Sequence, residues 1–176
     1  MSRDDLFNRF RALPMLKDVI GLECSGNDAT YFCTPVGAVV IGWLGVDGIH
    51  FCFIPSIHSD MIFAVSPMPC GQHYVEPIAR SFKDFLSLVY SCKGAGPLEQ
   101  VCWMDEQQFS KLLASEQETH WLEREAALNT LRQEFGIEPQ TNVYQSVKCL
   151  QDAFDYSVIP FSQEYYEILG IERNLD

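Results

Sequence analysis

The stretch Gly42–Ile54 constrains the fold of this chain more than any other. Two apolar runs flank the dipeptide Asp47-Gly48, and Asp-Gly most readily supplies the positive φ angles of a tight hairpin turn. Before the turn, Val36–Trp43 is apolar at odd and even positions alike, as is typical of a strand covered on both faces. Beyond it, side chains alternate between two faces. We expect one face to carry Ile49, Phe51 and Phe53, and the other His50, Cys52 and Ile54. A β-hairpin is therefore predicted at the centre of the fold.

Neighbouring segments extend this hairpin into an antiparallel meander between residues 29 and 79, because the connections are too short for crossovers. The pattern predicts a first strand over Thr30–Thr34, broken by Pro35 from the run that follows. Pro55–Asp60 is interpreted as a turn and Ser66–His73 as a Pro- and Gly-rich loop. The remaining predicted strands are Met61–Val65 and Tyr74–Ala79.

Helical patterns surround the meander and dominate its C-terminal side. Residues 3–13 predict a short amphipathic helix, and Ser81 is a helix N-cap for a segment that runs to Cys92. Further helices are expected over residues 98–103, 106–114, 116–135, 145–154 and 163–169. The fold class predicted is α+β, with an antiparallel sheet of about four to six strands packed by helices. Residues 1–96 would form the core, and residues 97–176 a helical extension packed on the same domain.

The charge balance is the most distinctive bulk property of the chain. Its 176 residues include 24 acidic and 12 basic residues, which gives a net charge of -12. A negative surface repels phosphate backbones, so nucleic-acid binding is disfavoured. It attracts basic proteins and speeds encounter with them. Solubility alone would also explain the charge.

Cysteine usage and hydropathy predict a cytoplasmic protein. The seven cysteines, an odd number, fall largely in apolar runs, where a free Cys behaves as a small hydrophobe. The N-terminal sequence lacks an apolar stretch of signal-peptide length. No segment approaches the ~20 apolar residues that span a bilayer, so no membrane association is expected.

The cysteines and histidines could serve catalysis, bind a metal or fill structural positions. His50 with Cys52, and Cys70 with His73, have the residue types of a zinc site. Cys70-Gly-Gln-His73 is the one doublet with ligand spacing, and the sequence has no Cys-x-x-Cys doublet to partner it. Cys52 or Cys70 with a nearby histidine could act as a nucleophile, yet no catalytic signature surrounds them. We therefore predict a non-enzymatic protein with no catalytic residues, no metal and no cofactor.

Side chains on turns and strand ends are the better candidates for binding, because a rigid scaffold presents them to partners. The acidic residues of the predicted helix Glu116–Phe135 are interpreted as a solvated face. Tyr165 and Tyr166 are interpreted chiefly as packing residues, with an interaction tip as the alternative. The predicted partner-binding residues are Asp47, His58, Asp60, His73 and Glu76.

The order of these motifs resembles the SUKH superfamily. Gly42-Trp43, the strand Asp47-Gly-Ile-His-Phe-Cys-Phe53 and the helix start Ser81-Phe-Lys-Asp-Phe-Leu86 carry the resemblance, which covers about residues 3–92. Two departures stand out. The segment after the Phe-Cys strand, acidic in the family, is Ile54-Pro-Ser-Ile-His58 here, and the family pattern leaves residues 97–176 unexplained.

The resemblance implies an α+β fold and a protein-binding function. Members act mainly as immunity proteins that bind and neutralise bacterial toxins, often nucleases, and eukaryotic relatives are regulatory interaction modules. Nuclease domains tend to be basic, so a net charge of -12 would suit such a partner. The leading hypothesis is an immunity protein that blocks a basic toxin. The alternative is an intracellular regulatory or scaffold module, for which a homodimer is one possible assembly.

Overall fold

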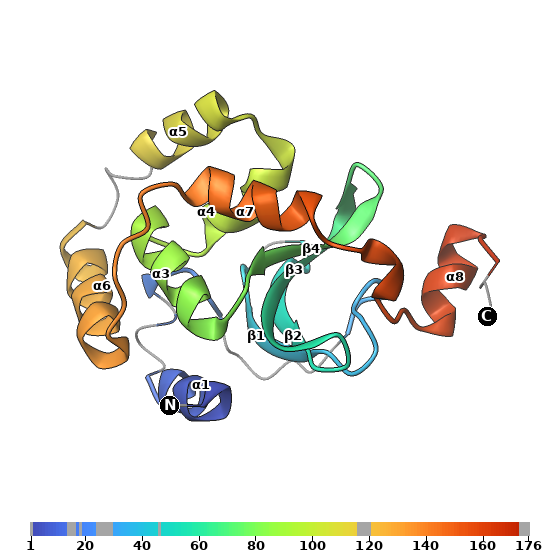
Figure 1. The fold of residues 1–176 in the computed structure, drawn as a ribbon, viewed down its shortest axis with the longest axis horizontal. Coiled ribbons are helices and arrows are strands. Elements are labelled where there is room, and N and C mark those ends of the chain that lie inside the picture. The colour runs from blue at the N-terminus through green and yellow to red at the C-terminus, as the bar shows by residue number, and fades with distance from the viewer. Residues whose placement is uncertain are drawn as a thin grey trace.

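The computed structural model describes residues 2–13, 17, 19–23, 30–45, 47–115 and 121–172, with the side chains of residues 121–123 left out. Its centre is a four-stranded antiparallel sheet in which strands adjacent in sequence are adjacent in space (Figure 1). The strands are β1 (Val39–Trp43), β2 (His50–Ile54), β3 (His58–Cys70) and β4 (His73–Ala79). The predicted α+β meander is confirmed.

The hairpin at Asp47-Gly48 forms as predicted. Both residues have positive φ, 48° for Asp47 and 72° for Gly48, and Trp43 of β1 lies opposite His50 of β2. Glycine is also needed for space at this position, because a Cβ on Gly48 would overlap the ring of Tyr31.

The predicted strand Thr30–Thr34 is wrong. These residues form a turn, in which the Thr34 backbone N–H donates to the Tyr31 carbonyl at 2.8 Å and the Tyr31 N–H donates to the Thr34 hydroxyl at 3.0 Å. A local side-chain partner thus replaces the strand ladder. β1 starts only at Val39, which is 44% exposed. As an edge strand, β1 is not covered on both faces along its length as Val36–Trp43 had predicted.

Two of the predicted connections between strands also have the wrong bounds. The predicted loop Ser66–His73 belongs mostly to a hairpin, since β3 continues to Cys70, which pairs with His73. An irregularity in the register between Val65 and Cys70 accommodates the prolines, which cannot donate to a ladder. The turn predicted over Pro55–Asp60 is shorter, because β3 already starts at His58.

The helices follow the predicted order. They are α1 (Arg3–Arg11), α3 (Phe82–Cys92), α4 (Gly96–Gln100), α5 (Glu106–Ser115), α6 (Trp121–Phe135), α7 (Val143–Asp152) and α8 (Gln163–Leu169), with 3₁₀ turns η1 (Val101–Trp103) and η3 (Tyr156–Val158). Ser81 caps α3 as predicted: its hydroxyl accepts from the Asp84 N–H at 3.1 Å. The predicted helix 145–154 starts and ends earlier, at Val143 and Asp152. Residues 116–120 of the predicted long helix lie outside the described residues.

The sheet is covered on both faces, by different parts of the chain. Phe51 and Phe53 of β2 belong to a core with side chains from α1, α3, α4, α5, α6 and α7. Cys52 and Ile54 face a second core built with Cys33 and the segment after α7, including Tyr165. The predicted alternation along β2 is therefore confirmed. After α7 the chain returns to the second face, where Phe32, Cys33 and Ala38 already pack, and α8 projects away from the rest of the fold (Figure 1).

Candidate functional site

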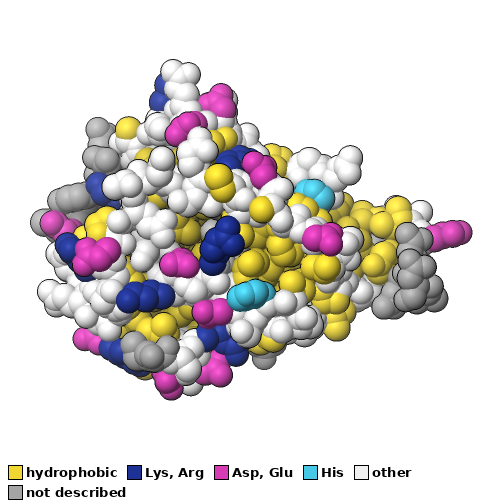
Figure 2. Space-filling view, viewed as in Figure 1, with side chains coloured by type: hydrophobic (Ala, Val, Ile, Leu, Met, Phe, Trp, Pro, Cys, Tyr) yellow, Lys and Arg dark blue, Asp and Glu magenta, His cyan; other side chains and the backbone are white. Residues whose placement is uncertain are grey.

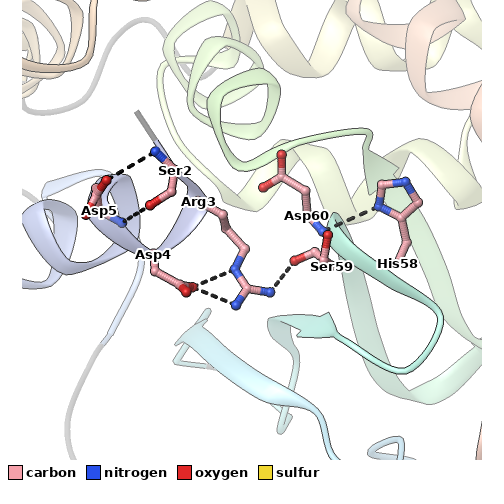
Figure 3. Close-up of polar contacts among 7 residues, drawn as sticks. All are labelled: Ser2, Arg3, Asp4, Asp5, His58, Ser59 and Asp60. Atoms are coloured by element: carbon pink, nitrogen blue, oxygen red, sulfur yellow. Dashed lines mark hydrogen bonds and ion pairs between the residues drawn. The ribbon is translucent and has the colours of Figure 1, made fainter.

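The start of α1 and the turn between β2 and β3 form one surface (Figure 3). A capping box begins α1: the Ser2 hydroxyl accepts from the Asp5 N–H, and the Asp5 carboxylate accepts from the Ser2 N–H, both at 3.2 Å. These bonds to the Ser2 side chain and backbone lower the pKa of Asp5. A fixed carboxylate therefore stands at the edge of this surface.

Arg3 joins the helix to the sheet. Its guanidinium pairs with Asp4, donates to the carbonyl of Ser59 and lies 5.0 Å from the ring centre of Phe53. At the start of β3, the Asp60 backbone N–H donates to His58 Nδ1 at 3.4 Å. Two of the predicted binding residues, His58 and Asp60, are thus brought together here (Figure 3).

The side chain of Asp60 is not simply displayed to solvent. Its Oδ1 atom is buried and has no hydrogen-bond partner among the residues that the structure describes. Such an atom costs free energy unless water or a partner satisfies it. Asp60 Oδ1 is therefore a buried acceptor on this surface without a hydrogen-bond donor among the described residues.

The other predicted binding residues lie elsewhere. Asp47 is exposed in the β1–β2 loop, at the opposite end of β2 from the Pro55 turn. His73 and Glu76 lie on β4 and meet through Tyr156, whose ring stacks on His73 at 3.6 Å and whose hydroxyl donates to Glu76 Oε2 at 2.5 Å. The five residues therefore form three separate groups.

Glu76 is a buried residue. It is only 8% exposed, and burial raises the pKa of its carboxyl, while the Tyr156 hydroxyl and Lys148 act in the opposite direction. Partial burial also lowers the pKa of His73. Glu76 fixes Tyr156 against the sheet, so contact with a partner would be through Tyr156 and not through the carboxylate.

Residues 153–172, here called the C-terminal arm, carry exposed apolar and acidic side chains that were not among the predicted binding residues. Its exposed acidic residues are Asp155, Glu164, Glu167 and Glu172, and it contains no Lys, Arg or His. Val158, Ile168 and Ile171 are 48%, 56% and 49% exposed. Hydrophobic side chains gather on this side of the molecule, with an acidic group at its far end (Figure 2). The absence of basic residues over positions 153–172 is the sequence feature that could have indicated this surface.

The tyrosines of the arm have the packing role that the sequence predicted. Tyr165 is 8% exposed, stacks on Phe161 with ring centres 3.8 Å apart and lies edge-on to Tyr74 of β4. Tyr166 packs against the same core. These contacts anchor one face of α8 and leave Ile168 outward.

Neither Cys52 nor Cys70, the two cysteines considered as catalytic nucleophiles, has the lowered pKa of an activated thiol. Burial raises the pKa of the Cys52 thiol and, more weakly, that of Cys70, whereas a nucleophilic cysteine needs a lowered pKa. Within the described ranges, no group of three or more His, Cys, Asp or Glu could hold a metal ion. His50 is instead a buried core residue, hydrogen-bonded to the Gly48 carbonyl at 2.9 Å.

A cavity of about 380 Å³ lies beside α4 and is lined by residues that include Ile20, Gly94, Leu112 and Arg124. This volume is within the range of small-molecule pockets, roughly 300–1,000 Å³. Its buried acid, Glu99, already accepts from Trp103 Nε1 at 2.9 Å and from the Gln100 amide. The cavity is thus large enough for a small ligand, but its carboxylate is engaged inside the protein.

Comparisons with protein-family models, curated proteins and solved structures found no match. Among the described residues, the structure contains no helix long and apolar enough to cross a membrane.

Proposed function

We propose that this chain is a SUKH-like protein-binding module and, specifically, an immunity protein that neutralises a basic, nuclease-type toxin by direct binding in the cytoplasm. The C-terminal arm carries the proposal. It combines exposed apolar side chains with acidic ones around them, and protein interfaces have this arrangement of apolar centre and polar rim.

The charge distribution supports a basic partner. Two exposed arginines are already paired within the chain, Arg9 with Glu134 at 3.0 Å and Arg132 with Glu138 at 2.8 Å. The acids of the arm are not offset by any basic residue in the same segment. A basic surface docking there would gain attraction during encounter and charge complementarity when bound.

The test is recovery of native partners with tagged protein at low and moderate salt, identified by mass spectrometry. We expect one basic, nuclease-like protein that is held more weakly as salt rises. Its nuclease activity should fall when the purified chain is added in equal amount. Recovery of only this chain, or of unrelated housekeeping complexes, would contradict the proposal.

A charge-reversal pair locates the contact. Glu164→Lys/Glu167→Lys should weaken retention of the basic partner by about tenfold or more, because it places like charges across the interface. The matched control is Glu106→Lys/Glu125→Lys on α5 and α6, which changes net charge equally; Glu106 and Glu164 each lie in a first helical turn. Equal weakening by both pairs would show that the arm is not the contact.

The alternative function is a regulatory or scaffold module that forms a homodimer, favoured by the 56% exposure of Ile168 on the arm. In that case light scattering should give twice the 20.0 kDa chain mass, and Ile168→Asp should return the protein to monomer. A monomer at all concentrations tested would exclude the homodimeric form of this alternative.

A further inference from the structure

Two cysteines distant in sequence meet at the tip of the β3–β4 hairpin. Cys70 is the last residue of β3 and Cys102 lies in η1. Both line one small cavity together with Met68 and Trp103, and the two thiols are close enough to shift each other's pKa. A second contact orients Cys102, whose thiol is 3.4 Å from the Glu99 carbonyl.

Both cysteines are partly exposed residues, which sets them apart from the cysteines of the core. Cys70 and Cys102 have intermediate exposure, whereas Cys33, Cys52 and Cys92 are buried. Met68 and Trp103 beside them are 61% and 43% exposed. A small oxidant can therefore approach from the surface formed by the hairpin tip and η1.

We propose that Cys70 and Cys102 form a reversible disulfide when the chain meets a low-molecular-weight disulfide such as oxidised glutathione. The Cys70 thiolate attacks one sulfur of the oxidant, which breaks the oxidant's S–S bond and releases one thiolate. The Cys102 thiolate then attacks the Cys70 sulfur of the mixed disulfide and releases the second. The two cysteines lose two electrons and two protons, and the oxidant becomes two thiols.

The environment assigns the first step to Cys70. The Cys102 S–H donates to the Glu99 carbonyl. The neighbouring Cys102 lowers the pKa of Cys70, although burial and the Glu76 and Glu99 carboxylates raise that pKa overall. Burial and Cys70 raise the pKa of Cys102 strongly, so Cys70 is the more readily ionised of the two thiols. The reaction is consequently slow at neutral pH, since only the thiolate reacts. This makes the pair a sensor of sustained oxidation.

The bond would connect two elements that are otherwise held by packing. Residues 71–101, with β4, α3 and α4, would lie within the closed loop. Such a cross-link restricts the unfolded chain and therefore stabilises the fold. It would also fix the exposed Met68 and Trp103 relative to each other.

Peptide mapping of the native wild-type chain tests the proposal. The protein is incubated with oxidised or reduced glutathione, its free thiols are alkylated, and the digest is examined for a linked Cys70–Cys102 peptide. We expect this peptide in the oxidised sample, two hydrogens lighter than the two free peptides, and its loss on addition of dithiothreitol. The map also reports the fate of Cys24, which lies outside the described residues.

Stability measurements supply the second readout. The oxidised wild type should unfold at higher urea concentration than the reduced form. Cys70→Ser and Cys102→Ser should abolish this difference, while Cys149→Ser, which removes an exposed thiol on α7, should leave it intact. Glutathione that stays on Cys70, a linked peptide seen only in urea, or a shift that persists in Cys102→Ser would overturn the proposal.

Discussion

At the scale of single residues, His50 shows how burial determines chemistry. Its ring is 0% exposed, lies 4.3 Å from the ring centre of Trp43 and has Nδ1 2.9 Å from the Gly48 carbonyl. That contact requires a proton on Nδ1, so Nε2, 3.4 Å from the Thr34 hydroxyl, is the acceptor of a neutral ring. His50 thus has the burial and the hydrogen bonds of a structural histidine.

A pH dependence of stability follows from this residue. Burial lowers the pKa of His50 below its ordinary value of 6.5. The folded state therefore favours the neutral ring, and the resulting stability is present above the unfolded pKa and is lost as pH falls below it. Urea unfolding at about pH 7.5 and about pH 5 should show that His50→Gln destabilises the protein more at the higher pH.

The control is a core change that does not titrate. Phe51→Leu alters the neighbouring residue of β2, also 0% exposed, and should lower the free energy of unfolding by the same amount at both pH values. An equal, pH-independent loss in His50→Gln would show that burial of the neutral imidazole contributes nothing to the pH profile.

At the scale of elements, the two serine caps differ in what depends on them. Ser81 caps α3, whose Phe82, Phe85 and Leu86 are fully buried. Ser162 caps α8 with a longer bond, 3.4 Å to the Tyr165 N–H, on an element that packs by one face only. The same type of serine cap therefore stabilises a core helix at Ser81 and a peripheral helix at Ser162.

This difference is measurable. Ser81→Ala should reduce the free energy of global unfolding by about 1 kcal/mol, because the Asp84 N–H loses its acceptor at the start of a core helix. Ser162→Ala should reduce it less, since α8 can loosen without exposing the main core. Ser81→Asp, which restores an acceptor, should recover most of the loss. Equal effects of the two alanine variants would mean that α8 unfolds together with the core.

At the scale of the whole molecule, charge opposes compactness. A net charge of -12 places many like charges on one small surface, and their mutual repulsion is lowest in the expanded chain. The exposed ion pairs offset little of it, because pairs of this kind contribute only about 0–1 kcal/mol.

Salt should consequently stabilise this protein. Raising NaCl from about 20 mM to about 0.3 M shortens the screening length to below about 10 Å, so the urea midpoint should rise. Glu164→Lys/Glu167→Lys, which makes the chain less negative, should show a smaller rise. A midpoint that falls with salt would mean that specific ion pairs outweigh the general repulsion.

Much of the local structure could be predicted from the sequence, because its causes are local. The Asp47-Gly48 turn, the alternation from Phe51 to Ile54 and the Ser81 cap depend on backbone preferences and on neighbours within a few residues. The strand predicted at Thr30–Thr34 was wrong for a related reason: the Thr34 hydroxyl offers the backbone a local partner that composition does not reveal. The prolines that indicated a loop over Ser66–His73 are accommodated instead by an irregular strand.

Tertiary structure alone decided which distant residues meet. The sequence by itself determined an acidic α+β chain with a central hairpin, since charge, period and turn chemistry are properties of the chain. It did not determine that Tyr156 would lie between His73 and Glu76, that Cys70 would lie beside Cys102, or that residues 32–38 and the segment after α7 would together cover the second sheet face. These contacts arise because both faces of the sheet must be covered, and the choice of covering segment depends on packing across the whole molecule.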